Sequence, residues 1–198
     1  MRWLTCPFHA VEAAVPRAGR ILEVGCGHGL LSLYLALCGS DRRVIGVDVD
    51  GAKVAEARAA TGRLEPADSA DVDFATVPPG WLPEEPADGI VIADVLYLLE
   101  TDAQRRLLKA CAGCLAPGGV LVVKETALQP GWKFRWNTIQ ETLSTRVLRI
   151  TAGGGGLHFV APATMATWLA DEGLLLSGRA LDRGYPWPHH LLVGRRLS

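Results

Sequence analysis

The sequence predicts an α/β fold in which a mostly parallel sheet carries helices on both of its faces. Short apolar runs typical of buried strands alternate along the chain with helical patterns, which is the order of consecutive βαβ units. The strand at residues 21–24 leads through a glycine-rich turn into a helical pattern at residues 30–36. The length of 198 residues fits one domain spanning residues 1–198.

The glycine-rich turn is the most specific local feature. Glu23 at the end of the strand is followed by glycines at every second position, Gly25, Gly27 and Gly29. Glycine is needed where the backbone takes a positive φ or where a ligand lies directly against it. The carboxylate of Glu23 offers an acceptor for an ammonium or hydroxyl group. A dinucleotide fingerprint would require its third glycine at position 30, where the chain has Leu30.

The next strand, at residues 43–48, ends in a second carboxylate. Asp48 lies about 20 residues beyond the glycine turn, where an acid can accept hydrogen bonds from both ribose hydroxyls of a nucleotide cofactor. Further elements are predicted in the order helix 51–60, buried strand 88–97, helix 101–115, the tripeptide Pro117-Gly118-Gly119, strand 120–125, helix 162–173, and strands 174–181 and 190–197.

In this order the motifs resemble those of the class I S-adenosylmethionine-dependent methyltransferases, in particular the small bacterial ones. The resemblance covers roughly residues 18–126. It implies a Rossmann-like, seven-stranded mixed sheet whose last two strands form an antiparallel hairpin, with the seventh strand beside the fifth. It also implies S-adenosylmethionine as cofactor and S-adenosylhomocysteine as product.

The resemblance assigns cofactor binding to the glycine turn and to the ends of the neighbouring strands. These residues are Glu23, Gly25, Cys26, Gly27, Gly29, Asp48, Val49, Asp94 and Val95. One expected residue is absent, because the third strand near residues 72–75 is followed by Thr76-Val77-Pro78-Pro79 and not by the acid that bonds adenine in this family. We therefore expect backbone groups or apolar packing to hold the adenine.

The methyl acceptor should approach the ends of the fourth and fifth strands, because ligands of open α/β sheets bind outside the carboxyl ends of the strands. Two segments are expected to cover this region, an N-terminal lid at residues 1–19 and an insertion at residues 127–161. An amphipathic stretch at residues 131–150 begins with two tryptophans. The residues predicted to line the acceptor site are Phe8, Tyr97, Trp132 and Trp136.

A phenol or other weak acid must lose a proton when it is methylated, which is the work of a histidine or carboxylate. The candidate bases are His158 and Glu125. For His158 the alternative is a loop histidine that faces solvent. For Glu125 the alternative is an ion pair with Lys124 or Arg135.

Composition narrows the class of protein. The net charge is −1 and the basic residues are scattered, which does not favour a nucleic-acid partner. No apolar run reaches the length of a transmembrane helix, and residues 1–20 lack the apolar core of a signal peptide.

The five cysteines lack disulfide-framework spacing, so we expect a cytoplasmic location and no metal site. Cys111 and Cys114 lie in a helical pattern and are read as structural thiols, with a redox or metal role as the alternative.

The leading hypothesis is methyl transfer to a small, partly apolar or aromatic acceptor, on oxygen. Methyltransferases that act on adenine or amide nitrogen often carry Asn/Asp-Pro-Pro-Tyr/Phe after the fourth strand, whereas this chain has Asp94-Val95-Leu96-Tyr97. The alternatives are a protein or RNA methyltransferase that needs a partner for recognition, and a noncatalytic cofactor-binding scaffold. The glycine spacing opposes an NAD-dependent oxidoreductase.

Overall fold

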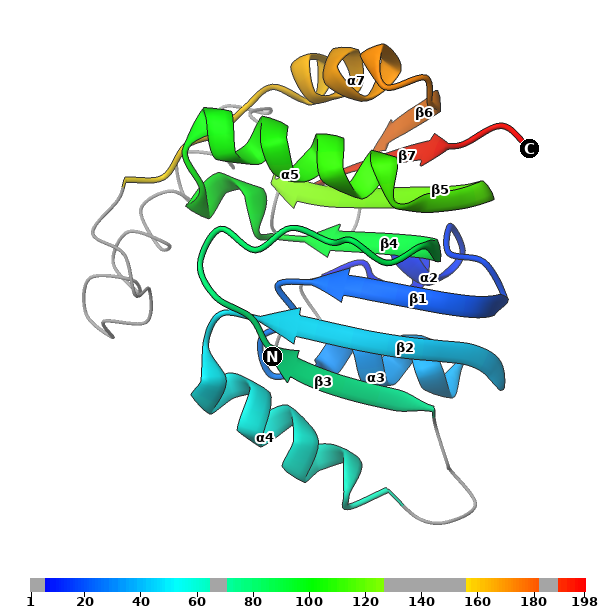
Figure 1. Ribbon diagram of the computed structural model, residues 1–198, viewed down its shortest axis with the longest axis vertical. Coiled ribbons are helices and arrows are strands. Elements are labelled where there is room, and N and C mark those ends of the chain that lie inside the picture. The colour runs from blue at the N-terminus through cyan, green and yellow to red at the C-terminus, as the bar shows by residue number, and fades with distance from the viewer. Residues whose placement is uncertain (1–5, 65–70, 127–155, 182–188) are drawn as a thin grey trace.

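The computed structural model describes residues 6–64, 71–126, 156–181 and 189–198. These residues form one seven-stranded mixed sheet with the strand order β3-β2-β1-β4-β5-β7-β6 (Figure 1). The strands are β1 (Ala18–Val24), β2 (Asp41–Asp48), β3 (Val72–Thr76), β4 (Ala87–Ala93), β5 (Leu115–Thr126), β6 (Leu175–Ala180) and β7 (His189–Arg195). The first five strands are parallel, whereas β7 runs antiparallel to both β5 and β6. The predicted sheet is therefore confirmed, including the seventh strand beside the fifth.

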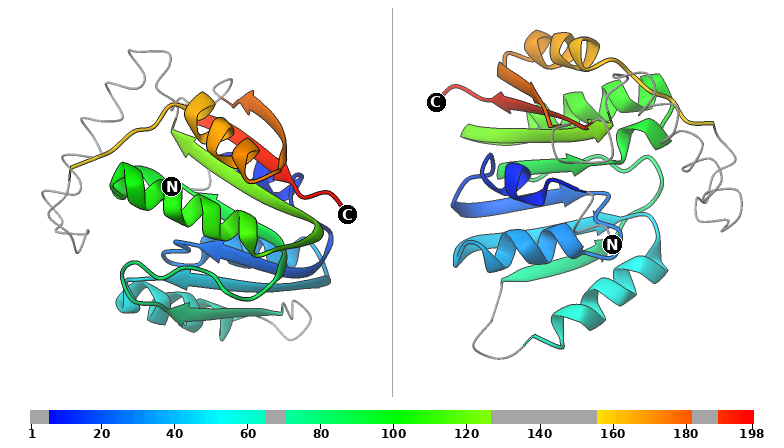
Figure 2. Two further views of the ribbon diagram at one scale, coloured as in Figure 1. Left: turned by 45° about the horizontal axis from the view of Figure 1, so that its top comes forward. Right: turned by 180° about the vertical axis from the view of Figure 1, so that it is seen from behind.

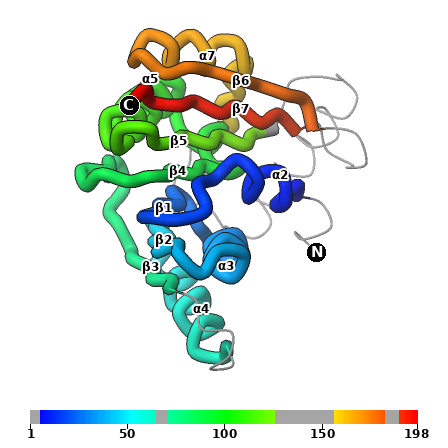
Figure 3. Tube along the Cα trace, turned by 90° about the vertical axis from the view of Figure 1, so that its right-hand side faces the viewer, coloured from blue at the N-terminus to red at the C-terminus, as the bar shows by residue number. Residues whose placement is uncertain are grey.

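Helices cover both faces of the sheet, as predicted. They are α2 (Phe8–Glu12), α3 (Leu30–Leu37), α4 (Gly51–Thr61), the short 3₁₀ helix η2 (Leu96–Leu98), α5 (Thr101–Gly113) and α7 (Pro162–Asp171). The views in Figures 2 and 3 show α2 and α3 on one side of the sheet and α5 and α7 on the other. Helix α4 lies beside the edge strand β3, where Val54 and Ala57 pack with Phe74.

An apolar core lies on each face of the sheet, between the strands and the helices that cover that face. Because successive strand residues point to opposite faces, Val91 and Val122 face the side of α2 and α3, while Ile92 and Val123 face the side of α5 and α7. Parallel strands that are covered on both faces are apolar throughout, which explains the continuous apolar run of β4.

The fourth strand is shorter than predicted. The pattern indicated a strand over residues 88–97, but β4 ends at Ala93 because Asp94 has a positive φ of 58°. The chain then turns into η2. This turn at the carboxyl end of β4 forms part of the site described below.

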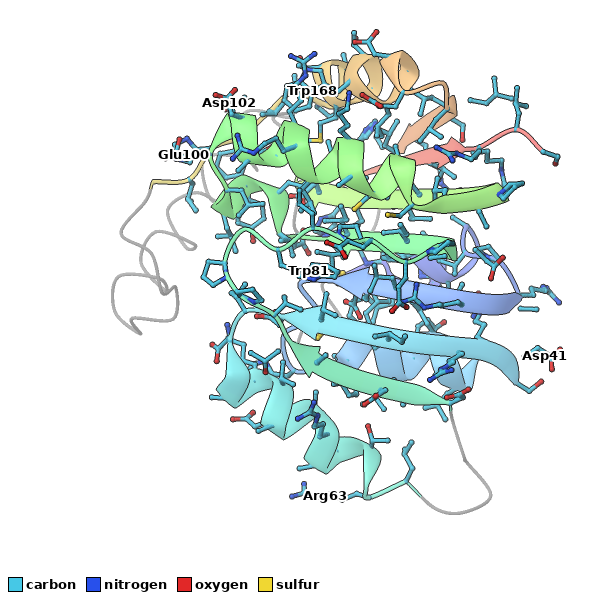
Figure 4. All side chains as sticks on the ribbon, viewed as in Figure 1. Asp41, Arg63, Trp81, Glu100, Asp102 and Trp168 are labelled. Carbon is cyan, nitrogen blue, oxygen red and sulfur yellow. The ribbon has the colours of Figure 1, made fainter. Side chains whose placement is uncertain are left out.

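The crossover from β3 to β4 is an irregular loop at residues 77–86. Trp81 packs from this loop onto the core that lies between the sheet and α5 (Figure 4). The guanidinium of Arg20 fastens the end of the loop, since it donates to the carbonyl of Pro86 over 2.8 Å and lies 2.7 Å from the carboxylate of Glu85. The thiol of Cys114 donates to the carbonyl of Pro83, which supports a structural role for this cysteine.

All five cysteines are free thiols. Burial raises the pKa of Cys111 above its usual range, so this thiol stays protonated and unreactive. Among the helices that the structure describes, none is long and apolar enough to cross a membrane.

Candidate active site

The glycine turn after β1 has the backbone conformation that its sequence predicts. Gly25, Gly27 and Gly29 have φ values of 78°, 54° and 75°. A Cβ atom at Gly25 would collide with the side chain of Val95, and one at Gly29 would lie 2.6 Å from the ring of Phe74. The two glycines therefore let the side chains of Val95 and Phe74 pack directly against the backbone of the turn.

Glu23 is held in place before this turn. Its side chain is 3% exposed and accepts a hydrogen bond from the hydroxyl of Ser32 on α3, which is itself fully buried. Burial of a carboxylate is costly unless it is hydrogen-bonded, so Ser32 fixes the orientation of Glu23. The sequence analysis did not identify Ser32, which carries no motif of its own.

Asp48 and the glycine turn are joined directly. One carboxylate oxygen accepts from the backbone N–H of Gly27 over 2.7 Å, and the other accepts from the N–H of Asp50 over 2.9 Å. The carboxyl end of β2 and the glycine turn after β1 are thus joined by a hydrogen bond. The apolar side chain of Val49 follows at the same edge and is 54% exposed.

Cys26 in the turn is a structural residue. It is 3% exposed, and its pKa is raised above the usual range first by burial and then by the charges of Glu23 and Asp48. A thiol in this state is a poor nucleophile, so Cys26 serves the turn by its size.

At the end of β4, Asp94 is paired with a buried cation. The ammonium of Lys124 on β5 is fully buried and lies 2.6 Å from each carboxylate oxygen of Asp94. The left-handed backbone conformation of Asp94 is costly for a residue other than glycine and is characteristic of functional sites. The alternative role for Glu125, an ion pair with Lys124, is therefore wrong. Adjacent strand residues point to opposite faces of the sheet, and Lys124 pairs with Asp94. Arg135, the other partner considered, lies outside the described residues.

Glu125 instead holds the turn that follows β4. One of its carboxyl oxygens accepts the backbone N–H groups of Val95 and Leu96, over 3.0 and 2.9 Å. The side chain is 5% exposed, and its burial, together with the nearby charge of Asp94, raises the pKa of Glu125 to about 8. A carboxyl group with this pKa exchanges its proton near neutral pH, which is the property of a general acid or base.

His158 lies against the same turn. Its backbone N–H donates to the carbonyl of Tyr97 over 2.8 Å, and its ring Nε2 lies 3.1 Å from the carboxylate of Glu100, which Figure 4 places where α5 begins. The next residue, Phe159, stacks on Tyr97 with ring centroids 5.4 Å apart. The structure thus brings Glu125, His158 and Tyr97 to one turn.

The other residues predicted to line the acceptor site are Phe8, Trp132 and Trp136. Phe8 is 4% exposed and packs in the core beside α3, with its ring centroid 6.2 Å from that of Tyr34. Phe8 thus belongs to the core, and a lid function at residues 1–19 stays a prediction. Trp132 and Trp136 lie outside the described residues. In the part of the chain that the structure covers, no cluster of three or more metal-ligating side chains is found.

Comparison with known proteins agrees with this geometry. The sequence model of a family described as "Methyltransferase domain" matches residues 21–119. A ubiquinone biosynthesis O-methyltransferase of Xylella fastidiosa (strain 9a5c) is 31% identical over 189 residues, which cover 89% of this chain and 70% of the relative. A trans-aconitate 2-methyltransferase of Methylobacterium radiotolerans is 38% identical over 122 residues, covering 61% of this chain and 44% of the relative.

Solved structures show the same fold at low sequence identity. The magnesium protoporphyrin IX methyltransferase ChlM of Synechocystis PCC 6803, with bound S-adenosylhomocysteine, superposes with a TM-score of 0.71 at 19% identity, covering 96% of this chain and 83% of that one. The cyclase SpnF superposes with a TM-score of 0.70, also at 19% identity, over 96% of this chain and 79% of that one. The fold alone therefore does not define a reaction. The family match and the sequence identity to O-methyltransferases indicate that the reaction is methyl transfer. The chain belongs to the methyltransferase domain family as a class I S-adenosylmethionine-dependent enzyme.

Proposed function

We propose that the enzyme transfers the methyl group of S-adenosylmethionine to an oxygen atom of a small, partly apolar or aromatic acceptor. One observation carries the proposal. At the carboxyl ends of β4 and β5, a buried carboxyl group, Glu125, and a stacked aromatic pair, Tyr97 and Phe159, contact the same turn. This arrangement places a titratable carboxyl group beside a pair of aromatic side chains.

The residues around the glycine turn suit the cofactor. Each carboxylate oxygen of Asp48 accepts one backbone hydrogen bond and so has a lone pair left for a ribose hydroxyl. Val49 would supply apolar packing to the adenine, in place of the missing acid. Asp94 and Val95 would border the methionine end. The bound cofactor supplies a methyl group that its sulfonium has already activated.

The protein must then align the acceptor oxygen and remove its proton. Alignment in a water-poor site contributes much of the rate of a transfer between two bound partners. Glu125 is buried and titrates near neutral pH, so it is our first candidate for the group that takes the proton. His158 is the second candidate, and its ring Nε2 lies 3.1 Å from the carboxylate of Glu100.

The names of the relatives support oxygen as the acceptor atom. The Xylella fastidiosa relative is named as an O-methyltransferase of ubiquinone biosynthesis. The Methylobacterium radiotolerans relative is named for trans-aconitate, a carboxylic acid, whose acidic groups also present oxygen. Phenols and carboxylic acids are therefore the two acceptor classes that we propose to test first.

An acceptor panel tests the proposal. The protein is incubated with S-adenosylmethionine and, separately, with 4-butylphenol, 4-butylcatechol, trans-aconitate, total tRNA or a protein extract, and release of S-adenosylhomocysteine is measured. We expect turnover with at least one phenol or carboxylate. Turnover with tRNA or protein alone would overturn the small-molecule proposal and favour the partner-dependent alternative. Binding of S-adenosylhomocysteine without any turnover would favour a noncatalytic scaffold.

We also propose that the protein works in the cytoplasm and without a nucleic-acid partner. The five free thiols suit a reducing compartment. The near-neutral net charge of −1 gives little electrostatic attraction to phosphate backbones.

A further inference from the structure

A polar residue lies in the apolar face of α5. Gln104 is fully buried, and the other buried residues of this helix are Leu107, Leu108, Cys111 and Ala112. A buried amide costs free energy unless its polar atoms are hydrogen-bonded. The hydrogen bonds of Gln104 therefore indicate what the residue does.

The side-chain amide joins two segments that are distant in sequence. Its Nε2 donates to the carbonyl of Leu99 over 2.9 Å and to the carbonyl of His158 over 2.7 Å. Its Oε1 is buried and has no hydrogen-bond partner among the described residues. An apolar side chain of similar size would fill the same space without an unpaired oxygen, so the contribution of the amide lies in the two bonds that it donates.

The segment that Gln104 holds is part of the proposed acceptor site. The N–H of His158 bonds to the carbonyl of Tyr97, and the ring of Phe159 stacks on that of Tyr97. On its other side the same turn is held by Glu125. The turn also borders the cofactor turn, since Val95 occupies the space in which Gly25 has no side chain.

We propose that Gln104 is a positioning residue of the acceptor site, whose side-chain amide fixes His158 and Phe159 against the turn that follows β4. The inference rests on the proposed function, in which the acceptor enters over the ends of β4 and β5. Gln104 itself touches neither acceptor nor cofactor in this account. It acts through the backbone of His158.

The test compares Gln104→Met, which keeps the size of the side chain and removes both donors, with Leu108→Ala. Leu108 is fully buried one turn further along the same helix and makes no hydrogen bond to residues 156–161, so it controls for lost stability. We expect hydrogen exchange of the His158 amide to become about tenfold faster in Gln104→Met and to remain near the wild-type rate in Leu108→Ala.

Kinetics provide the second readout. With 4-butylcatechol as the acceptor, we expect KM to rise about tenfold in Gln104→Met while the Kd of S-adenosylhomocysteine changes less than about twofold. Wild-type exchange at His158 in Gln104→Met, or an equal rise of KM in both variants, would overturn the proposal. If Gln104→Met does not fold, Gln104→Asn is used, because its shorter amide cannot reach both carbonyls, and the same results are expected.

The experiments distinguish a failure of the positioning role of Gln104 from a failure of the proposed function. If the wild-type protein bound S-adenosylhomocysteine but methylated no small acceptor, the proposed function would fall. The exchange rate of His158 in the two variants would still decide whether Gln104 holds this segment.

Discussion

The ammonium of Lys124 lies 2.6 Å from both carboxylate oxygens of Asp94, and this ion pair joins the ends of β4 and β5. Lys124 is fully buried, whereas the side chain of Asp94 is 15% exposed. A buried pair of this kind contributes little compared with apolar residues, but the loss of one partner leaves an uncompensated charge. The pair therefore fixes Asp94 in its left-handed conformation at the edge of the cofactor site.

We predict that Lys124→Met lowers the free energy of unfolding by about 3–5 kcal/mol, because the carboxylate of Asp94 loses its buried cation. Urea denaturation measures the change. Lys109→Met is the matched control, since Lys109 is 71% exposed and pairs with Glu172 at the surface, where ion pairs contribute about 0–1 kcal/mol. Equal losses in the two variants would contradict the role of the buried pair.

Asp48 should determine cofactor affinity. Asp48→Ala removes the acceptor of the Gly27 and Asp50 amides and, in our account, the partner of the ribose hydroxyls. We expect the Kd of S-adenosylhomocysteine, measured by calorimetry, to rise about 100-fold, which corresponds to about 2.7 kcal/mol. Asp73→Ala on β3 serves as the control, because within the described part of the chain its carboxylate accepts from the adjacent amide of Phe74, and the Kd of this variant should equal that of the wild type.

Glu125 should make stability depend on pH. Its folded pKa of about 8 lies above that of an ordinary glutamate, so the native state binds the proton more tightly than the unfolded state. The contribution to stability is complete below the unfolded pKa and is lost as the pH rises through about 8. The charged and titratable neighbours are Asp94, Lys124 and His190, which lies opposite Glu125 in the β5–β7 ladder and whose pKa is lowered by burial.

The measurement is chemical denaturation of the wild type and of Glu125→Gln between pH 5 and pH 9. Glutamine cannot ionise, so the stability of the wild type relative to Glu125→Gln should fall as the pH increases. A constant difference between the two proteins across this range would contradict a raised pKa at Glu125.

The two candidate bases predict different kinetics. If Glu125 takes the acceptor proton, kcat/KM with 4-butylphenol should rise with pH toward about 8, and Glu125→Gln should lose this rise. A wild-type profile that stays flat, or a rise that persists in Glu125→Gln, would remove Glu125 from this role.

For His158 we expect His158→Ala to lower turnover at least about tenfold while cofactor affinity is unchanged. Glu100→Gln keeps the imidazole but removes the carboxylate that lies 3.1 Å from its Nε2, so it should reduce turnover much less. Unchanged turnover in His158→Ala would exclude His158 as the base, and an equal loss in Glu100→Gln would indicate that the contact with Glu100 and not the imidazole alone matters.

The sequence predicted those parts of the site that depend on residues close to one another in the chain. The glycines of the first turn are required by positive φ values within five residues, and Asp48 follows directly from the end of a strand. Such features depend on neighbouring residues, so a pattern can indicate them. The fold followed from the order of strands and helices for the same reason.

The contacts that sequence reasoning missed join residues that only the fold brings together. Lys124 and Asp94 are 30 residues apart, and Gln104 and His158 are 54 apart. A polar residue within an apolar helical face, as at Gln104, was a signal that could have been used. Phe8 was predicted near the acceptor as part of the N-terminal segment, and its burial beside α3 depends on the way α2 packs against the sheet.

The most direct test of the account is to follow the methyl group itself. The protein is incubated with S-adenosylmethionine that carries a carbon-13 methyl group, together with 4-butylcatechol, 4-butylphenol and trans-aconitate, and the products are examined by NMR. We predict that the label appears as a methoxy group or a methyl ester on at least one acceptor. Label on carbon or nitrogen, or no transfer to any small acceptor by a protein that binds S-adenosylhomocysteine, would contradict methylation of a small molecule on oxygen.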